Sequence, residues 1–143
     1  MVPRTKVLFL CIGNACRSQM AEAIARHMAS DVIEPSSAGL VPFGMIPGTT
    51  LAVLRELGIS ADGQCSKPLR PEDMSAADVV INMTGRCGTS IFTEPVAWIE
   101  DWDVGDPYGF NLAVYREIRD RIEERVDELA RRLRERADSS GAS

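Results

Sequence analysis

The stretch that decides the fold is VLFLCIGNACRSQMAEAIARHM, residues 7–28. Val7–Ile12 is a continuous apolar run, which is typical of a strand buried on both faces. Apolar residues then recur every three or four positions over Ser18–Met28, which predicts an amphipathic helix. A turn of this kind between a strand and a helix often holds a phosphate, but neither GxGxxG nor GxxxxGK[ST] is present. Instead, Cys11 stands just before the turn.

Strands and helices continue to alternate along the chain. Further strands are expected at Val32–Ser37, Val79–Met83 and Val96–Trp98, and further helices at residues 47–59, 70–78 and from about Asn111. This order implies right-handed crossovers and a parallel sheet of about four strands. The sequence therefore predicts one α/β domain over residues 1–137, a four-stranded parallel sheet flanked by helices, and a disordered tail at 138–143. Ligands bind such sheets beyond the carboxyl ends of the strands, where Cys11 would lie.

Composition excludes several classes of partner. The 143 residues are 45% hydrophobic and 26% charged, which suits one compact domain. The formal net charge of −5 predicts no binding to nucleic acid or to an anionic membrane. The apolar runs are too short to cross a bilayer, and no signal peptide is recognisable, so we expect a cytoplasmic protein.

The four cysteines indicate neither a disulfide scaffold nor a metal site. They are Cys11, Cys16, Cys65 and Cys87. Structural zinc usually takes cysteines in closely spaced pairs, and the last two stand alone. We therefore expect reduced thiols, no metal and no cofactor.

Cys11 and Arg17 frame a segment that we call the cysteine loop, residues 11–18. Its remaining members, expected to surround an anion, are Ile12, Gly13, Asn14, Ala15, Cys16 and Ser18. If the strand ends at Cys11 and the helix begins near Ser18, successive N–H groups converge above the sulfur. They favour a thiolate, and the planar Arg17 fork suits two oxygens of a tetrahedral anion. The alternative is a buried structural cysteine followed by a helix-start arginine.

Transfer of a phosphoryl group to sulfur also needs an acid for the leaving oxygen. The single histidine, His27, lies a helix length away, whereas the segment at residues 100–109 is rich in carboxylates. Within it, Asp106 precedes a proline, which biases Asp106 toward an extended conformation that projects its side chain. Asp106 is therefore the candidate acid, although an ordinary Asx turn would explain the same pair.

These residues resemble the low-molecular-weight protein tyrosine phosphatase family, whose fold is shared with thioredoxin-coupled arsenate reductases. The resemblance covers nearly the whole chain and is carried by VLFLCIGNACRS at 7–18, SSAG at 36–39, GISADGQCSKPL at 58–69, ADVVINMT at 77–84 and DPYG at 106–109. It implies that Cys11 is the nucleophile, Arg17 binds phosphate and Asp106 is the general acid. It further implies that Asn14, Ser18 and Ser37 support the loop, and that Phe43 and Tyr108 form an aromatic rim.

Two segments keep the reductases open, residues 18–23 and the segment after Gly39, which is also similar to the reductases. SQMAEA at residues 18–23 resembles them, because the phosphatases usually have proline after the Arg-Ser pair. The thioredoxin-coupled reductases, however, relay oxidation through two further cysteines after the third strand. That region holds only Cys87, with Thr84 near the place of the first.

The expected activity is hydrolysis of a phosphomonoester, on a phosphotyrosine protein or a small aryl phosphate, through a phosphocysteine. Phosphate, sulfate and arsenate are the expected oxyanion ligands. One alternative is arsenate reduction by Cys11 with a second thiol, which would be Cys87, Cys16 or an external thiol such as thioredoxin or a small thiol. Another is a non-catalytic module that binds phosphoproteins. Cys16 is in addition the expected disulfide partner of Cys11 under oxidation.

Overall fold

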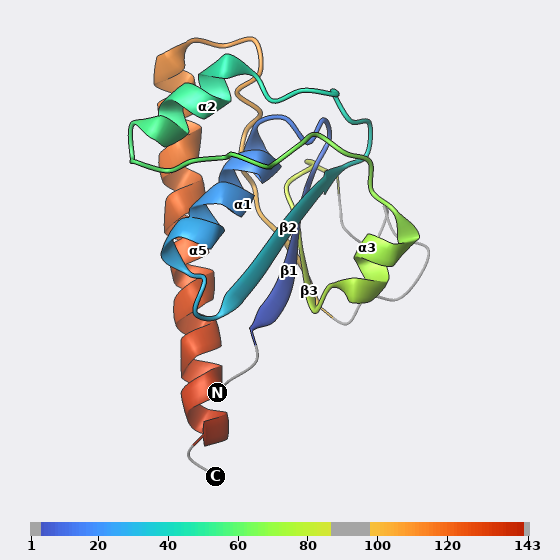
Figure 1. The fold of residues 1–143 in the computed structure, drawn as a ribbon, viewed down its shortest axis with the longest axis vertical. Helices are drawn as coiled ribbons and strands as arrows, with labels where there is room; N and C mark the ends of the chain where they lie inside the picture. Colours follow the sequence, from blue (N-terminus) through green and yellow to red (C-terminus); the bar gives the residue numbers. More distant parts are fainter. Residues whose placement is uncertain (1–3, 87–97, 142–143) are drawn as a thin grey trace.

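A computed structural model of the chain describes residues 4–86 and 98–141 (Figure 1). Four strands and four helices follow one another in the described residues. They are β1 (Thr5–Cys11), α1 (Arg17–Met28), β2 (Ile33–Gly39), α2 (Gly48–Arg55), α3 (Pro71–Ala76), β3 (Val79–Asn82), β4 (Ile99–Asp101) and α5 (Leu112–Gly141). No described helix is long and apolar enough to span a membrane.

The strands form one parallel sheet in the order β2-β1-β3-β4, which confirms the predicted architecture. In the register of the central strand, Leu8 pairs with Ser36 on β2 and with Val80 on β3. The next strand in the chain, β2, thus pairs with one side of β1, and β3 pairs with its other side. The carboxyl end of β1 therefore lies where the strand order reverses, the usual ligand position in an open parallel sheet.

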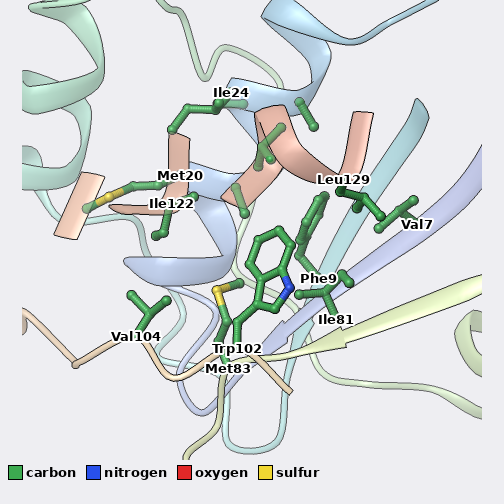
Figure 2. Packing of buried hydrophobic residues seen from close by; sticks show 14 of the residues in the cluster. Val7, Phe9, Met20, Ile24, Ile81, Met83, Trp102, Val104, Ile122 and Leu129 are labelled. Carbon is green, nitrogen blue, oxygen red and sulfur yellow. The ribbon is translucent and has the colours of Figure 1, made fainter. Parts of the chain in front are cut away.

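Helices cover both faces of the sheet, which explains the continuous apolar run of β1. Figure 1 shows α1, α2 and α5 on one side of the sheet and the short α3 on the other. Val7 and Phe9 point into the larger core, whereas Leu8 and Leu10 point into a smaller cluster beneath α3. In the larger core, Phe9 packs against Trp102 with ring centroids 5.9 Å apart, and Ile122 and Leu129 of α5 close over them (Figure 2).

The fourth strand lies later in the chain than predicted. The apolar segment Val96–Trp98 was expected to form it, but β4 is Ile99–Asp101; residues 96–97 lie outside the described residues. β4 is at the edge of the sheet, where polar residues are tolerated because one side faces away from the ladder. Its carboxylates have partners: Asn82 donates to Asp101 at 2.8 Å, and Arg132 donates to Glu100 at 2.8 Å.

The last helix is longer than predicted. α5 continues through residues 138–141, part of the tail for which the composition suggests disorder. Its apolar stripe includes the buried residues Ile122, Val126, Leu129 and Leu133, all of which precede that segment.

Candidate active site

The carbonyl groups of the cysteine loop point away from its centre, because neighbouring segments donate hydrogen bonds to them. Backbone N–H groups of Leu40, Val41 and Phe43 bond the carbonyls of Cys11, Ile12 and Gly13, and side chains of Gln19 and Thr50 bond those of Asn14 and Ala15, at 2.8–3.2 Å. The N–H and C=O groups of a trans peptide point in opposite directions. The N–H groups of residues 12–16 therefore turn inward, as an anion cradle requires.

Two backbone positions make this curl possible. Asn14 has a φ of 48° and is the only non-glycine residue with positive φ in the described parts of the chain. Gly39, at the end of β2, lies against the loop so closely that a Cβ atom there would approach Asn14 N and Ile12 O to 2.8 Å. The glycine of the SSAG segment is therefore needed for close backbone approach.

Cys11 ends β1 directly beneath this cradle. Its side chain is nearly buried, and its Sγ lies 2.8 Å from the Ser18 hydroxyl. No side chain caps the first turn of α1, so the N–H groups of that turn remain available to an anion or a thiolate. The cavity above the sulfur has a volume of about 220 Å³ and is lined by Cys11, Ile12, Gly13, Ala15, Cys16, Arg17, Val41, Phe43, Asp106 and Tyr108.

Arg17 is held in place by two backbone carbonyls. Its Nη1 donates to the backbone carbonyls of Met83, at 2.5 Å, and Val104, at 3.3 Å. These carbonyls follow β3 and β4, so two strand ends fix one face of the guanidinium. Its Nη2 lies 3.7 Å from Oδ2 of Asp106. Arg17 also lines the cavity above Cys11, so it has further N–H donors to offer to an anion there.

Asp106 stands at the mouth of the cavity with its side chain about half exposed. Its Oδ1 accepts the backbone N–H of Tyr108 at 3.0 Å, which is an Asx turn. The two interpretations of the Asp-Pro pair are therefore compatible, because the turn itself fixes the carboxylate beside Arg17.

Phe43 and Tyr108, the two residues predicted to form an aromatic rim, lie together beside the cavity. Their ring centroids are 5.1 Å apart in an edge-to-face arrangement, and both side chains are about half exposed. They come from different loops, after β2 and after β4, and meet beside the cavity.

The structure separates one predicted loop-support residue from the other two. Asn14 Nδ2 donates to the Ser18 hydroxyl at 2.8 Å. The Ser37 hydroxyl instead donates to the carboxylate of Glu22, which also bonds Arg26. Ser37 therefore supports the loop indirectly, because its hydrogen bond joins β2 to α1.

Sequence reasoning missed the buried Gln19 and its neighbour Gln64. The Gln19 amide reaches both oxygens of Asn14 and the carbonyl of Cys65, and Gln64 donates to Gln19. One signal was present: Gln19 belongs to a run of polar residues at the start of a helix that otherwise faces the core, and such residues stay buried only with partners.

The remaining cysteines differ in their surroundings. Cys16 lines the same cavity as Cys11, and its Sγ lies 3.6 Å from the Tyr115 hydroxyl. Burial raises the pKa of the Cys16 thiol and raises that of Tyr115 to about 12, so both stay protonated near neutral pH. Cys65 is exposed in a separate hollow, and Cys87 lies outside the described residues.

Across residues 4–86 and 98–141, no group of three or more His, Cys, Asp or Glu side chains is arranged to hold a metal ion.

The fold and cavity define a class, a parallel α/β domain with a cysteine at the end of its central strand and an anion-sized cavity above it. A family model described as low molecular weight phosphotyrosine protein phosphatase matches residues 6–139. The chain therefore belongs to this family, which confirms the resemblance seen in the sequence.

Relatives within the family carry different activities in their names. A glutaredoxin arsenate reductase from Synechocystis sp. is 38% identical, with 90% of this chain and 98% of the relative covered. A protein-arginine-phosphatase from Bacillus subtilis is 32% identical, with 90% and 96% covered. The crystal structure of a low molecular weight protein tyrosine phosphatase from T. tengcongensis superposes with a TM-score of 0.81 at 33% identity, with 90% and 99% covered. Membership thus establishes an enzyme of this family but leaves open which reaction it catalyses.

Proposed function

We propose that the chain is a cysteine-dependent phosphomonoester hydrolase that acts on aryl phosphates, phosphotyrosine above all. The observation that carries the proposal is the placement of Asp106, whose carboxylate shares one 220 Å³ cavity with Cys11 and lies 3.7 Å from Arg17. Ester hydrolysis needs an acid for the leaving oxygen. Capture of an oxyanion alone needs no such group.

The proposed reaction has two steps. The Cys11 thiolate attacks phosphorus, the bond to the ester oxygen breaks, and Asp106 gives its proton to that oxygen, leaving a phosphocysteine. Asp106, now a carboxylate, takes a proton from water, which attacks phosphorus and releases phosphate and the thiolate. The inward N–H groups and Arg17 stabilise the equatorial oxygens in both steps.

The surface around the cavity supports an organic ester as substrate. Every large hydrophobic side chain that is exposed in the described residues lies on one of the two rim loops or at the start of α5. They are Val41, Phe43, Met45, Tyr108, Phe110 and Leu112. An exposed apolar group of this kind marks a binding surface, and a bare oxyanion has no apolar part to contact it. An aromatic ring that enters the cavity beside Phe43 and Tyr108 has such a part.

Arsenate reduction is the second candidate, favoured by the name of the Synechocystis relative. In that reaction Cys11 attacks arsenic, and a second thiol must then take up the oxidation. Cys16 is the other thiol that lines the cavity, whereas Cys65 lies in a different hollow. Within the described residues, the candidates for the second thiol are therefore Cys16 and an external thiol.

Parallel assays test the two candidates. Turnover of 4-nitrophenyl phosphate and a phosphotyrosine peptide is measured without reductant carriers, beside arsenate reduction with glutaredoxin, thioredoxin or a small thiol. We expect ester turnover that is lost in Cys11→Ser, with the fold retained, because the cradle is backbone and the nucleophile is sulfur. Arsenate turnover without ester turnover would overturn the proposal, as would a Cys11→Ser rate within about tenfold of the parent. Phosphopeptide binding without either activity would indicate a binding module.

A further inference from the structure

A line of hydrogen-bonded side chains leads from the protein surface to Cys11. We call it the side-chain relay; its members, in order, are Arg26, Gln64, Gln19, Asn14, Ser18 and Cys11. Each neighbouring pair is joined at 2.7–2.9 Å. The relay crosses from the segment before α3 to α1 and the cysteine loop, and three of its members are side-chain amides, each with a donor end and an acceptor end.

The outer end of the relay has only one possible direction. A guanidinium donates and never accepts, so the Gln64 oxygen must face Arg26, 2.8 Å away. The Gln64 nitrogen then faces Gln19, where it donates to Oε1 at 2.7 Å and to the backbone carbonyl at 3.2 Å. Arg26 therefore fixes the orientation of the first amide, and the first amide fixes the second.

The inner end agrees with this direction independently. The Gln19 nitrogen faces three acceptors, the Asn14 carbonyl, Asn14 Oδ1 and the Cys65 carbonyl, at 2.9–3.0 Å. Asn14 Oδ1 also accepts the backbone N–H of Lys67 at 2.9 Å. Backbone groups cannot exchange these roles, so the Asn14 oxygen faces Gln19 and its nitrogen faces Ser18.

This order decides which way the Ser18 hydroxyl points. Its oxygen accepts from Asn14 Nδ2 at 2.8 Å, so its single hydrogen is free for the Cys11 sulfur, also 2.8 Å away. A hydroxyl that donates to sulfur stabilises a thiolate. The relay thus links the Arg26 guanidinium at the surface to the orientation of the Ser18 hydroxyl, which donates to the Cys11 sulfur.

We propose that Gln64 and Gln19 are positioning residues whose fixed amide orientation keeps the Ser18 hydroxyl donating to Cys11. The inference rests on the proposed role of Cys11 as a nucleophile, but it concerns the thiolate and applies equally to ester hydrolysis and to arsenate reduction. Gln64 is only half buried and does not line the cavity, so it contributes through orientation rather than contact.

Gln64→Glu tests the direction of the relay. The introduced carboxylate has only acceptors, so it still satisfies Arg26 but leaves Gln19 Oε1 facing a second acceptor, which favours a turned Gln19 amide with its nitrogen outward. This preference competes with the backbone groups at the inner end, because a turned Gln19 loses its bonds to the carbonyls of Asn14 and Cys65. To the extent that Gln19 turns, the Asn14 amide turns with it, gives up its bond from the Lys67 N–H and presents its own oxygen to Ser18. The Ser18 hydroxyl now donates to Asn14 instead of to Cys11. Gln64→Met is the matched control, because it removes the donor without reversing the others.

The readout is the rate at which iodoacetamide alkylates Cys11 between pH 5 and 9, followed by peptide mapping so that the other cysteines do not contribute. We expect Gln64→Glu to slow alkylation at pH 6 by about tenfold and Gln64→Met by no more than about threefold, while the rates converge at pH 9. Salt at about 0.5 M screens the added charge itself. Thermal unfolding of each variant reports whether its fold is kept.

Three outcomes would overturn the inference: unchanged alkylation in Gln64→Glu, equal slowing in both variants, or slowing that salt abolishes. Because alkylation needs no substrate, these outcomes are independent of ester turnover. A parent protein that lacks ester turnover yet shows the difference between variants would refute the proposed function alone.

Discussion

The orientation of the Arg17 side chain depends on the ends of two strands of the sheet. Its guanidinium is anchored by carbonyls that follow β3 and β4, so its orientation depends on strands far away in sequence. A lysine at this position has one nitrogen and cannot satisfy those carbonyls while also holding two oxygens of a ligand. We expect Arg17→Lys to lower kcat for aryl phosphates by ~10²–10³-fold, as for loss of a donor to a developing oxyanion.

Steady-state kinetics on 4-nitrophenyl phosphate, together with inhibition by inorganic phosphate, checks the Arg17 prediction. Phosphate should bind the variant more weakly than the parent. An effect within about threefold on both quantities would mean that Arg17 serves only to join the strand ends.

Asp106 is the residue whose replacement separates acid catalysis from binding. Asp106→Asn keeps the size of the side chain and the oxygen that accepts from Tyr108, but it cannot donate the proton that the leaving group requires. We expect a rate lower by ~10²–10⁴-fold, with the loss smallest for activated leaving groups that need little protonation. A series of aryl phosphates with leaving groups of different acidity measures this dependence. Equal losses across the series would place the acid elsewhere, with Asp103 as the next residue to replace.

At the scale of elements, the cysteine loop holds two thiols with unequal properties. Both line one cavity, but burial raises the pKa of Cys16, which keeps it protonated near neutral pH. Peroxide converts the Cys11 thiolate to a sulfenic acid. Attack by the Cys16 thiolate then forms the disulfide and displaces hydroxide, which takes a proton from solvent to become water. Because the attacking group must be deprotonated, disulfide closure should become faster as pH rises.

We therefore expect peroxide inactivation that dithiothreitol reverses, with better recovery at pH 8.5 than at pH 6.5. Cys16→Ser should retain most of the turnover and recover poorly. Peptide mapping after mild oxidation identifies the bond, and a link between Cys11 and Cys87 would refute this pairing and favour the reductase.

The elements that the sequence predicts well are those with a strong local pattern. β1 and α1 follow from an apolar run and a helical period, and the loop between them follows from its residue types. β4 does not, because an edge strand of Ile, Glu and Asp is stabilised by pairing with β3 and by distant partners such as Arg132. Gln19 and Gln64 were missed for the same reason, since their roles depend on contacts across 45 residues of sequence.

At the scale of the whole molecule, α5 supports the cysteine loop through contacts with α2. Thr50 on α2 donates to the carbonyl of Ala15 in the cysteine loop, and α2 in turn is tied to α5. The connection is Glu56, which directly follows α2 and accepts three hydrogen bonds from Arg116 and one from Arg119 at 2.6–3.0 Å. Arg119 also donates to the carbonyl of Val53. The last helix therefore supports the loop through α2.

This connection gives the last prediction, on acid stability. The Arg116 and Arg119 guanidinium groups lower the pKa of Glu56 from its ordinary 4.5 to about 2. A carboxyl whose pKa is depressed in the folded state stabilises it fully above the unfolded value and loses that contribution as pH falls through the folded one. The stabilisation by Glu56 should therefore be complete above about pH 5 and fade toward pH 2.

Glu56→Gln should lower Tm at pH 7, and the Tm of the variant should approach that of the parent as pH falls through that range. Glu117→Gln is the matched control, because Glu117 is exposed and its ion pair among the described residues is with Arg121 on its own helix, at 3.2 Å. We expect little change in Tm for this variant. Tm curves for parent and Glu56→Gln that stay parallel from pH 7 to pH 2 would show that the ion pairs do not join α2 to α5 in solution.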